Sequence, residues 1–225
     1  MNVVVFAARK GGSGKSTLAA HLASSRSPRS CLLVDADPQG SLSLWHKLRN
    51  EDGLKLRQAA RGVNEIVKSA AREGYDWVLV DTPPTMTAVV ADAIRAATLV
   101  VVPARPTVFD LSAVAETIRL CRDLRRPYAV VLNAAPAKRN DNESPIVTEA
   151  RAGLSKLNVP LWAGQITNRT SYALALAAGE GAKEYDAGSL AAAEMSSLWS
   201  AIEKSVKVIN GANRGASSVM HRAAA

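Results

Sequence analysis

A short glycine-rich run near the start of the chain has the residue types that bind phosphate. It reads KGGSGKST (residues 10–17), shortly after the apolar run VVVFA (residues 3–7) and before a helical pattern. Glycines let backbone N–H groups curl around phosphate oxygens, and a helix beginning there points the positive end of its dipole at them. The sequence therefore predicts a nucleotide site formed by Lys10, Gly11, Gly12, Ser13, Gly14, Lys15, Ser16 and Thr17.

Three side chains of this loop have distinct expected roles. Lys15 is expected to reach the β- and γ-phosphates and to be catalytic, Ser16 to ligate Mg²⁺, and Thr17 to lie near the α-phosphate. The common pattern G-x-x-x-x-G-K-[ST] places glycine at position 9, where this chain has Arg9. The run also holds a second lysine, Lys10, for which that pattern has no use.

Carboxylates follow two apolar runs further along the chain. Asp35 and Asp37 end the run in LLVDADPQGS, and Asp81 closes the run in YDWVLVDTPP. Mg²⁺ prefers oxygen ligands, and ligands bind open α/β sheets at the carboxyl ends of the strands. We therefore predict a metal site from Ser16, Asp35 and Asp81, and a catalytic role for Asp37 in positioning water. The alternative for Asp35 and Asp37 is a turn or a helix cap.

Alternating apolar runs and helical patterns predict one doubly wound α/β domain with a mostly parallel sheet. The predicted strands are Val3–Ala7, Ser30–Asp35, Trp77–Asp81, Leu99–Pro103 and Ala129–Asn133, with weaker ones at Leu54–Arg57 and Leu161–Gly164. Helices are expected over Lys15–Ser25, Asn64–Arg72, Ala88–Ala96, Val108–Leu124 and Ser189–Ile209. The domain is expected to span residues 1–210, and the Gly/Ala/Ser-rich segment 211–225 to be a disordered tail.

The composition is typical of a globular protein, and its charge indicates the kind of partner. The chain has 225 residues, is 48% hydrophobic and carries a formal charge of +8, which favours polyanionic partners. The alternative is that this charge is spread evenly and only keeps the protein soluble. Cys31 and Cys121 have no partner motif and are expected to be small core residues. With neither a signal peptide nor a long apolar stretch, we expect a cytoplasmic protein.

The three nucleotide motifs, KGGSGKST, VDADPQGS and VLVDTPP, resemble those of the deviant Walker A ATPases of the ParA/MinD family. The segments VVVPARPTVFDLSA and ITNRTSYALALAAGEGAKEYDAG resemble the small plasmid-partition branch, the ParF-like proteins. The resemblance covers Met1 to about Ile209 and implies a P-loop fold that dimerises when it binds ATP and Mg²⁺. It also implies that Lys10 is the signature lysine, which crosses the dimer interface to the phosphates of the other subunit, and that Asn133 contacts adenine. A plain strand-end turn is the alternative for Asn133.

The resemblance also implies where the positive charge is used. Arg169 matches a DNA-binding arginine of the family, and Lys204 and Lys207 lie on the last helix, where relatives carry basic residues. Such contacts would be to phosphates, without sequence preference and strongly salt-dependent. The alternative is that they are solvated helix-face residues. Membrane attachment, as in a MinD-like regulator, is not expected, because the segment after Ile209 has no continuous apolar face.

The resulting functional hypothesis is an ATPase that hydrolyses ATP slowly until a partner stimulates it. It would bind the DNA of the nucleoid and segregate DNA together with a centromere-binding adaptor. The same ATPase could instead position a protein cargo such as a chemotaxis cluster or a microcompartment, and nothing in the chain separates the two. A nitrogenase-type reductase is disfavoured because Cys31 begins a strand, away from the phosphates. A small-molecule kinase would not need Lys10, and a scaffold with a dead site would not need Lys15, Ser16, Asp37 and Asp81.

Overall fold

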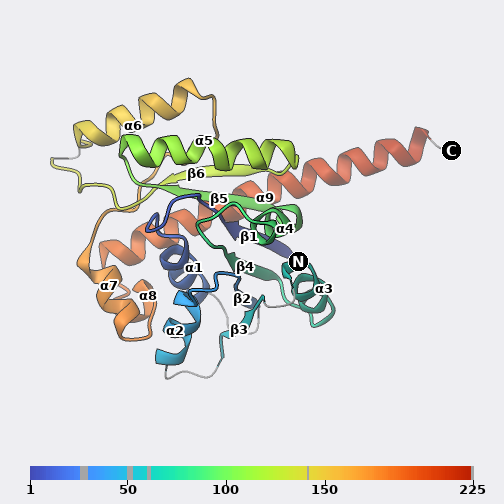
Figure 1. Ribbon diagram of the computed structural model, residues 1–225, viewed down its shortest axis with the longest axis horizontal. Helices are drawn as coiled ribbons and strands as arrows, with labels where there is room; N and C mark the ends of the chain where they lie inside the picture. The colour runs from blue at the N-terminus through green and yellow to red at the C-terminus, as the bar shows by residue number, and fades with distance from the viewer. Residues whose placement is uncertain (26–29, 50–52, 60–61, 141, 224–225) are drawn as a thin grey trace.

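The computed structural model describes residues 1–25, 30–49, 53–59, 62–140 and 142–223. In this part of the chain six strands form one sheet with the order β3-β2-β4-β1-β5-β6, and every neighbouring pair is parallel (Figure 1). The strands are β1 (Asn2–Phe6), β2 (Cys31–Asp35), β3 (Lys55–Gln58), β4 (Trp77–Asp81), β5 (Leu99–Ala104) and β6 (Tyr128–Leu132). The predicted doubly wound α/β fold is confirmed.

Continuous Val/Leu runs form the central strands because both faces of the sheet are covered by helices. Alternate side chains of β1 enter different layers, so Val3 and Val5 belong to one core and Val4 and Phe6 to the other. The first layer is completed by α3 (Val63–Arg72), α4 (Ala88–Ala96), α5 (Val108–Asp123) and α6 (Pro145–Lys156). The second is completed by α1 (Lys15–Ser24), α2 (Ser41–Leu48), α7 (Thr170–Ala177), α8 (Ala182–Tyr185) and α9 (Leu190–Ala223).

The predicted strand Leu161–Gly164 is wrong, because pairing with β6 stops after one bridge, between Val130 and Leu161. Two hydrogen bonds join this segment to Val130. The Val130 N–H donates to the Pro160 carbonyl, and the Trp162 N–H donates to the Val130 carbonyl. At Gly164 the backbone then folds against the Trp162 ring, where a Cβ atom would lie 2.4 Å from that ring. After this turn the segment no longer pairs residue by residue with β6, the edge strand of the sheet.

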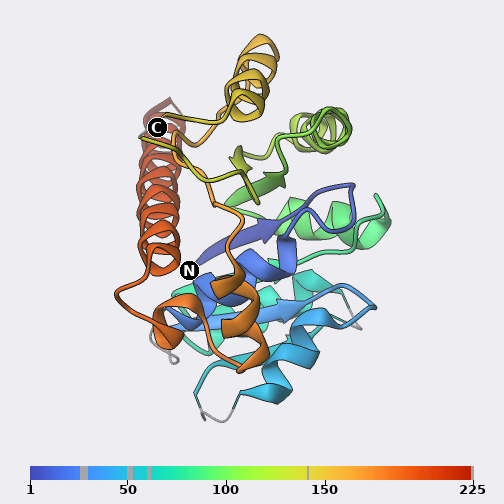
Figure 2. The same cartoon turned by 90° about the vertical axis from the view of Figure 1, so that its left-hand side faces the viewer.

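The last helix, α9, is longer than the predicted Ser189–Ile209. Its buried stripe of Met195, Leu198, Trp199, Ile202 and Val206 packs against the sheet, as the periodicity predicted. The helix continues to Ala223 through most of the segment that we expected to be a disordered tail, while residues 224–225 lie outside the described part. Figure 2 shows α9 (red) running along one side of the molecule, and in Figure 1 its C-terminal part extends beyond the sheet. No proline interrupts Leu190–Ala223, so the backbone hydrogen-bond pattern can continue.

Both cysteines are fully buried, in agreement with their expected packing role, and burial raises the pKa of the Cys121 thiol to about 12. Among the described helices, none combines the length and the apolar character needed to cross a bilayer.

Candidate nucleotide-binding site

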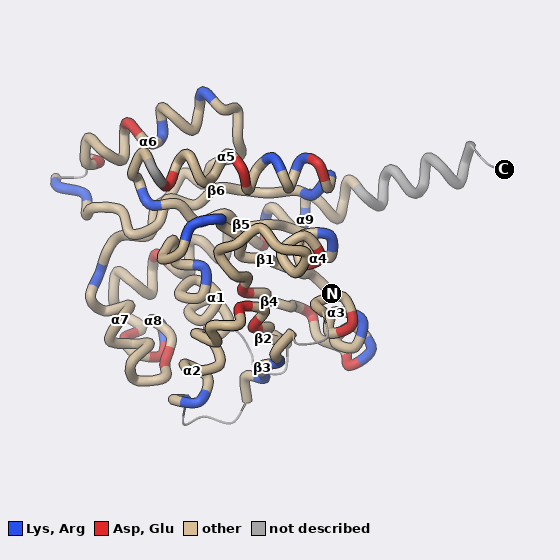
Figure 3. Tube along the Cα trace, viewed as in Figure 1, with Lys and Arg blue, Asp and Glu red and all other residues tan. Residues whose placement is uncertain are grey.

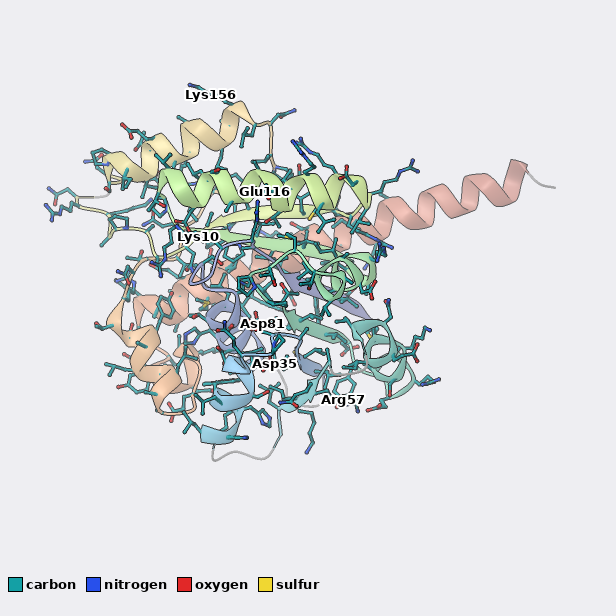
Figure 4. All side chains as sticks on the ribbon, viewed as in Figure 1. Lys10, Asp35, Arg57, Asp81, Glu116 and Lys156 are labelled. Carbon is teal, nitrogen blue, oxygen red and sulfur yellow. The ribbon has the colours of Figure 1, made fainter. Side chains whose placement is uncertain are left out.

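A cleft of about 570 Å³ opens at the carboxyl edge of the sheet, where β1, β2 and β4 end. The phosphate loop forms one wall, and the segments that follow β2 and β6 form much of the rest. Asp35 and Asp81 are neighbours in the register of β2 and β4, and Figure 4 shows both below Lys10 at this edge. The fold thus brings together the loop and the carboxylates that the sequence assigned to one site.

The loop depends on glycine at two positions with left-handed backbone. Gly12 has φ +71° and Gly14 has φ +100°, and Gly14 is the N-cap of α1. The Asn133 amide, which is buried beside this turn, donates a hydrogen bond of 2.7 Å to the Ser13 carbonyl. Asn133 therefore braces the phosphate loop from the end of β6. Asn133 also borders the cleft, where a nucleotide base could reach it. Its contact with adenine stays a prediction.

Lys15 is a buried cation on the floor of the cleft, with only 5% of its surface exposed. Its ammonium group donates to the Lys10 carbonyl at 3.3 Å, which curls the side chain back into the loop. Burial lowers the pKa of Lys15, whereas the nearby charges of Asp81 and Asp37 raise it. An anion entering the cleft would favour the charged form of this side chain.

Asp81 ends β4 and is fully buried. Its Oδ2 accepts a 2.5 Å hydrogen bond from the Ser16 hydroxyl, while Oδ1 has no hydrogen-bond partner among the described residues. The pKa of Asp81 is raised to about 7, mainly by burial and also by the charges of Asp35 and Asp37, whereas Ser16 and Lys15 act to lower it. A buried carboxylate oxygen without a partner is an unsatisfied acceptor that a cation would stabilise.

The other two predicted carboxylates have different surroundings. Asp35 is buried and its Oδ2 accepts from the Ser43 N–H at 2.9 Å and the Ser43 hydroxyl at 2.7 Å. Its Oδ1 accepts from the Asp37 N–H at 3.2 Å, so Asp35 organises the loop between β2 and α2. Asp37 is half-buried and faces the cleft directly. The roles assigned to both residues stay predictions.

These residues fit a magnesium ion that arrives with a nucleotide. Mg²⁺ keeps several waters and usually takes one or two carboxylates together with phosphate oxygens. The described residues contain no cluster of three or more His, Cys, Asp or Glu side chains that would hold a metal alone. The Ser16 hydroxyl and the unpartnered Asp81 oxygen are the oxygen donors that such an ion would use.

Lys10 is held by a residue that the sequence analysis missed. Its ammonium group pairs with Oδ2 of Asp110 at 2.6 Å, and the Thr107 hydroxyl donates to the same oxygen at 2.5 Å. Asp110 lies in the first turn of α5, where Thr107 is the N-cap, and the neighbouring Arg9 pairs with Glu116 of the same helix. Figure 4 shows Lys10 beside α5. Threonine followed three residues later by an acid reads as a helix cap, so the sequence carried no separate signal for this contact.

The three predicted DNA contacts do not lie together. Arg169 is the N-cap of α7, borders the cleft and pairs with Glu194 at 2.8 Å. Lys204 and Lys207 are exposed on α9. Figure 3 shows that lysine and arginine occur on several elements of the described chain. The cleft also has rim residues that sequence reasoning missed, namely Gln39, Trp45, Pro84, Arg105, Thr167, Asn168 and Tyr172.

The bracing of the phosphate loop predicts different outcomes at two of its glycines. A Cβ atom on Gly14 would lie 2.0 Å from Nδ2 of Asn133, whereas one on Gly11 would meet nothing within 4 Å. The left-handed backbone costs an L-residue about 1–2 kcal/mol before any clash. We expect Gly14→Ala to weaken ATP binding at least about tenfold and Gly11→Ala to leave it within about twofold of wild type. Titration calorimetry would measure both, and equal affinities would contradict the bracing role of Asn133.

Comparison with known proteins gives the same assignment. The model of the CobQ/CobB/MinD/ParA nucleotide-binding domain family matches residues 4–182. Maintenance of carboxysome distribution protein A of Gloeobacter kilaueensis is 40% identical over 52% of this chain and 55% of its own length. The chromosome-partitioning ATPase Soj of Thermus thermophilus is 32% identical over 54% of this chain and 62% of its own length. The matches thus span less than two thirds of these two relatives.

A solved structure of the septum site-determining protein MinD from Pyrococcus horikoshii, complexed with Mg-ADP, superimposes with a TM-score of 0.72. The alignment covers 92% of this chain and 98% of that one at 16% identity, so it compares the folds alone. The family model, in contrast, is a sequence match, and the range it covers includes the phosphate loop and both carboxylate motifs. The chain belongs to the CobQ/CobB/MinD/ParA family of nucleotide-binding domains.

Proposed function

We propose that this chain is an ATPase whose ATP-bound dimer binds DNA without sequence preference and drives DNA partition together with an adaptor protein. The observation that carries the proposal is the cleft itself. Lys15, Ser16 and Asp37 line it, the buried Asp81 accepts a hydrogen bond from Ser16, and Lys10 belongs to the same loop as Lys15. The similarity to Soj, a chromosome-partitioning ATPase, supports the DNA cargo.

The residues divide the chemistry of ATP hydrolysis among them. The backbone N–H groups of the loop and the Lys15 ammonium would neutralise the phosphates, and Ser16 and Asp81 would hold Mg²⁺. When bound, Mg²⁺ supplies further charge neutralisation on the β- and γ-phosphates. Asp37, half-buried at the cleft, would orient the attacking water by accepting its proton in a hydrogen bond.

Lys10 would act across a dimer interface. Its side chain is 41% exposed although it pairs with Asp110, so it lies where a second subunit could reach it. A cation supplied in trans can accelerate phosphoryl transfer by about 10³–10⁵-fold in arginine-finger enzymes. Closure of the dimer would then depend on nucleotide in both subunits. ATP would in this way control whether the protein is in the dimeric state that binds DNA.

A protein cargo is the second candidate function. The similarity to maintenance of carboxysome distribution protein A favours it, because that name describes the distribution of a protein assembly. The ATPase would be the same in both cases, and a separate adaptor would select the cargo. A MinD-like role at the membrane is less favoured, since the apolar stripe of α9 already packs against the sheet.

The decisive experiment measures binding to a random-sequence DNA duplex at two salt concentrations. ADP is compared with ATP plus Mg²⁺, and Asp37→Ala is used to hold the ATP state. We expect binding only with ATP, weakening steeply as salt rises. If neither nucleotide state binds DNA while ATP still binds, the DNA partition role is excluded and the protein cargo becomes the leading function.

The two exposed lysines of α9 give a quantitative prediction. In the Asp37→Ala background with ATP, Lys204→Ala/Lys207→Ala is expected to lower the slope of log K against log salt by about 2, because each phosphate contact contributes about 0.9. The matched control is Lys68→Ala/Lys156→Ala, which removes two exposed lysines from helices of the other layer. An unchanged slope in the α9 variant would remove both lysines from the DNA surface.

The Lys10–Asp110 pair predicts a variant that dimerises more readily. Lys10 cannot bind Oδ2 of Asp110 and reach a second subunit at the same time. Asp110→Asn weakens the contact within one subunit, so we expect the ATP-dependent dimer to form about tenfold more tightly, as for loss of one charge-assisted contact. Glu116→Gln, on the same helix but paired with Arg9, is the control.

Sedimentation velocity with ATP in the Asp37→Ala background measures the dimer dissociation constant. Adding Lys10→Ala to Asp110→Asn should abolish the gain. A weaker dimer in Asp110→Asn alone would instead give Asp110 a supporting role in assembly.

A further inference from the structure

Glu194 of α9 is the common acceptor of a partly buried cluster of hydrogen bonds beside the nucleotide cleft. Its Oε1 accepts from Nη2 and Nε of Arg169 at 2.8 and 3.2 Å. Its Oε2 accepts from the Thr167 N–H at 3.0 Å and from the Tyr172 hydroxyl at 2.8 Å. The carboxylate is well shielded, with 17% of the side chain exposed, so these hydrogen bonds are protected from solvent.

All four donors come from one short segment, Thr167–Tyr172, which ends the connection from β6 and begins α7. Every residue of this segment named above borders the cleft. Glu194 lies 22 to 27 residues further along the chain and belongs to the helix whose stripe is anchored on the sheet. One side chain therefore fixes the cleft rim to a rigid element.

This rim lies at the end of the cleft where a nucleotide base would be placed. The carboxylates suited to Mg²⁺ and the γ-phosphate follow β2 and β4, on one side of β1. The rim is joined to the opposite edge of the sheet, because the Ile166 N–H donates to the Leu132 carbonyl of β6 and the Ala135 N–H to the Ile166 carbonyl. A triphosphate bound on the loop with its terminal end toward the carboxylates directs its base toward this rim.

The charges around Glu194 agree with such a bracing function. Burial raises the pKa of Glu194, but the hydrogen bonds from Arg169, Thr167 and Tyr172 outweigh it, and the pKa lies below its ordinary value. Glu194 is thus ionised at neutral pH. The Arg169 guanidinium pairs with it within the same subunit, and Arg169 also borders the cleft.

We propose that Glu194 is a positioning residue of the nucleotide cleft, which holds the rim segment Thr167–Tyr172 in the place where it packs against the base of the bound nucleotide. The inference rests on the proposed nucleotide site. It assigns to α9 a second task besides covering the sheet, and it gives Arg169 a fixed place at the cleft.

The test compares two probes that differ in whether they carry a base, ATP with Mg²⁺ and inorganic triphosphate with Mg²⁺. Both occupy the phosphate loop, but only ATP reaches the rim. The variants are Glu194→Ala, Glu194→Gln and Tyr172→Phe, and titration calorimetry measures each dissociation constant. Glu203→Gln is the matched control, because it is an acid-to-amide change on α9 at a residue that does not border the cleft in the described chain.

We expect Glu194→Ala to weaken ATP binding about tenfold, as for loss of a charged hydrogen-bond acceptor, and to leave triphosphate binding within about twofold. Glu194→Gln keeps one acceptor and should have a smaller effect of the same kind. Tyr172→Phe removes one of the four donors with little change of volume, so it tests the cluster even if Glu194→Ala folds poorly.

Two results would overturn the inference. Unchanged ATP affinity in Glu194→Gln and Tyr172→Phe would show that the cluster does not support nucleotide binding. Equal losses for ATP and triphosphate would show that Glu194 only stabilises the fold. If the wild-type protein binds neither probe, the nucleotide site itself is wrong, which is a different failure from either of these.

Discussion

The buried carboxylate of Asp81 is the constraint around which the site is built. An ionised group at the end of a central strand is expensive unless something compensates it, and one of its oxygens has no partner in the described structure. The Ser16 hydroxyl and the Lys15 ammonium reduce the cost, yet burial still dominates and raises its pKa to about 7. The site is therefore electrostatically incomplete, and a nucleotide that carries a cation would complete it. The glycines at φ +71° and +100° and the Asn133 brace keep the loop open for that ligand.

A second consequence concerns the two lysines of the loop, which the fold treats differently. Lys15 is buried at the floor of the cleft, where its ammonium group donates to the Lys10 carbonyl of the loop. Lys10 points outward and is engaged by the first turn of α5. The α5 helix thus competes with any acceptor that a second subunit would bring. Under the proposed function, one buried and one exposed cation would let the same loop bind nucleotide and also contact a second subunit.

Much of the fold and of this site could be predicted from local sequence. Continuous Val/Leu runs marked the central strands, and the loop and carboxylate motifs were contiguous. The errors arose where local signals were ambiguous. The apolar run at Leu161 does not continue as a strand because of the turn at Gly164. The α9 helix continues through Asn210 and Gly211, residue types that often end a helix. Asp110 and Glu194 could not be found in this way, since their partners lie 100 and up to 27 residues away. Such contacts exist only once the topology has brought the elements together.

The α9 helix shows why these long-range contacts matter for function. One face supplies the apolar stripe from Met195 to Val206 that covers the sheet, and that packing makes the helix rigid. The same rigid body carries Glu194 near the cleft and Lys204 and Lys207 on its exposed side. A displacement of the cleft rim cannot be absorbed at Glu194 without disturbing four hydrogen bonds. Glu194 and the two exposed lysines thus lie on one continuous helix, so the cleft rim and the surface predicted to contact DNA share a single element.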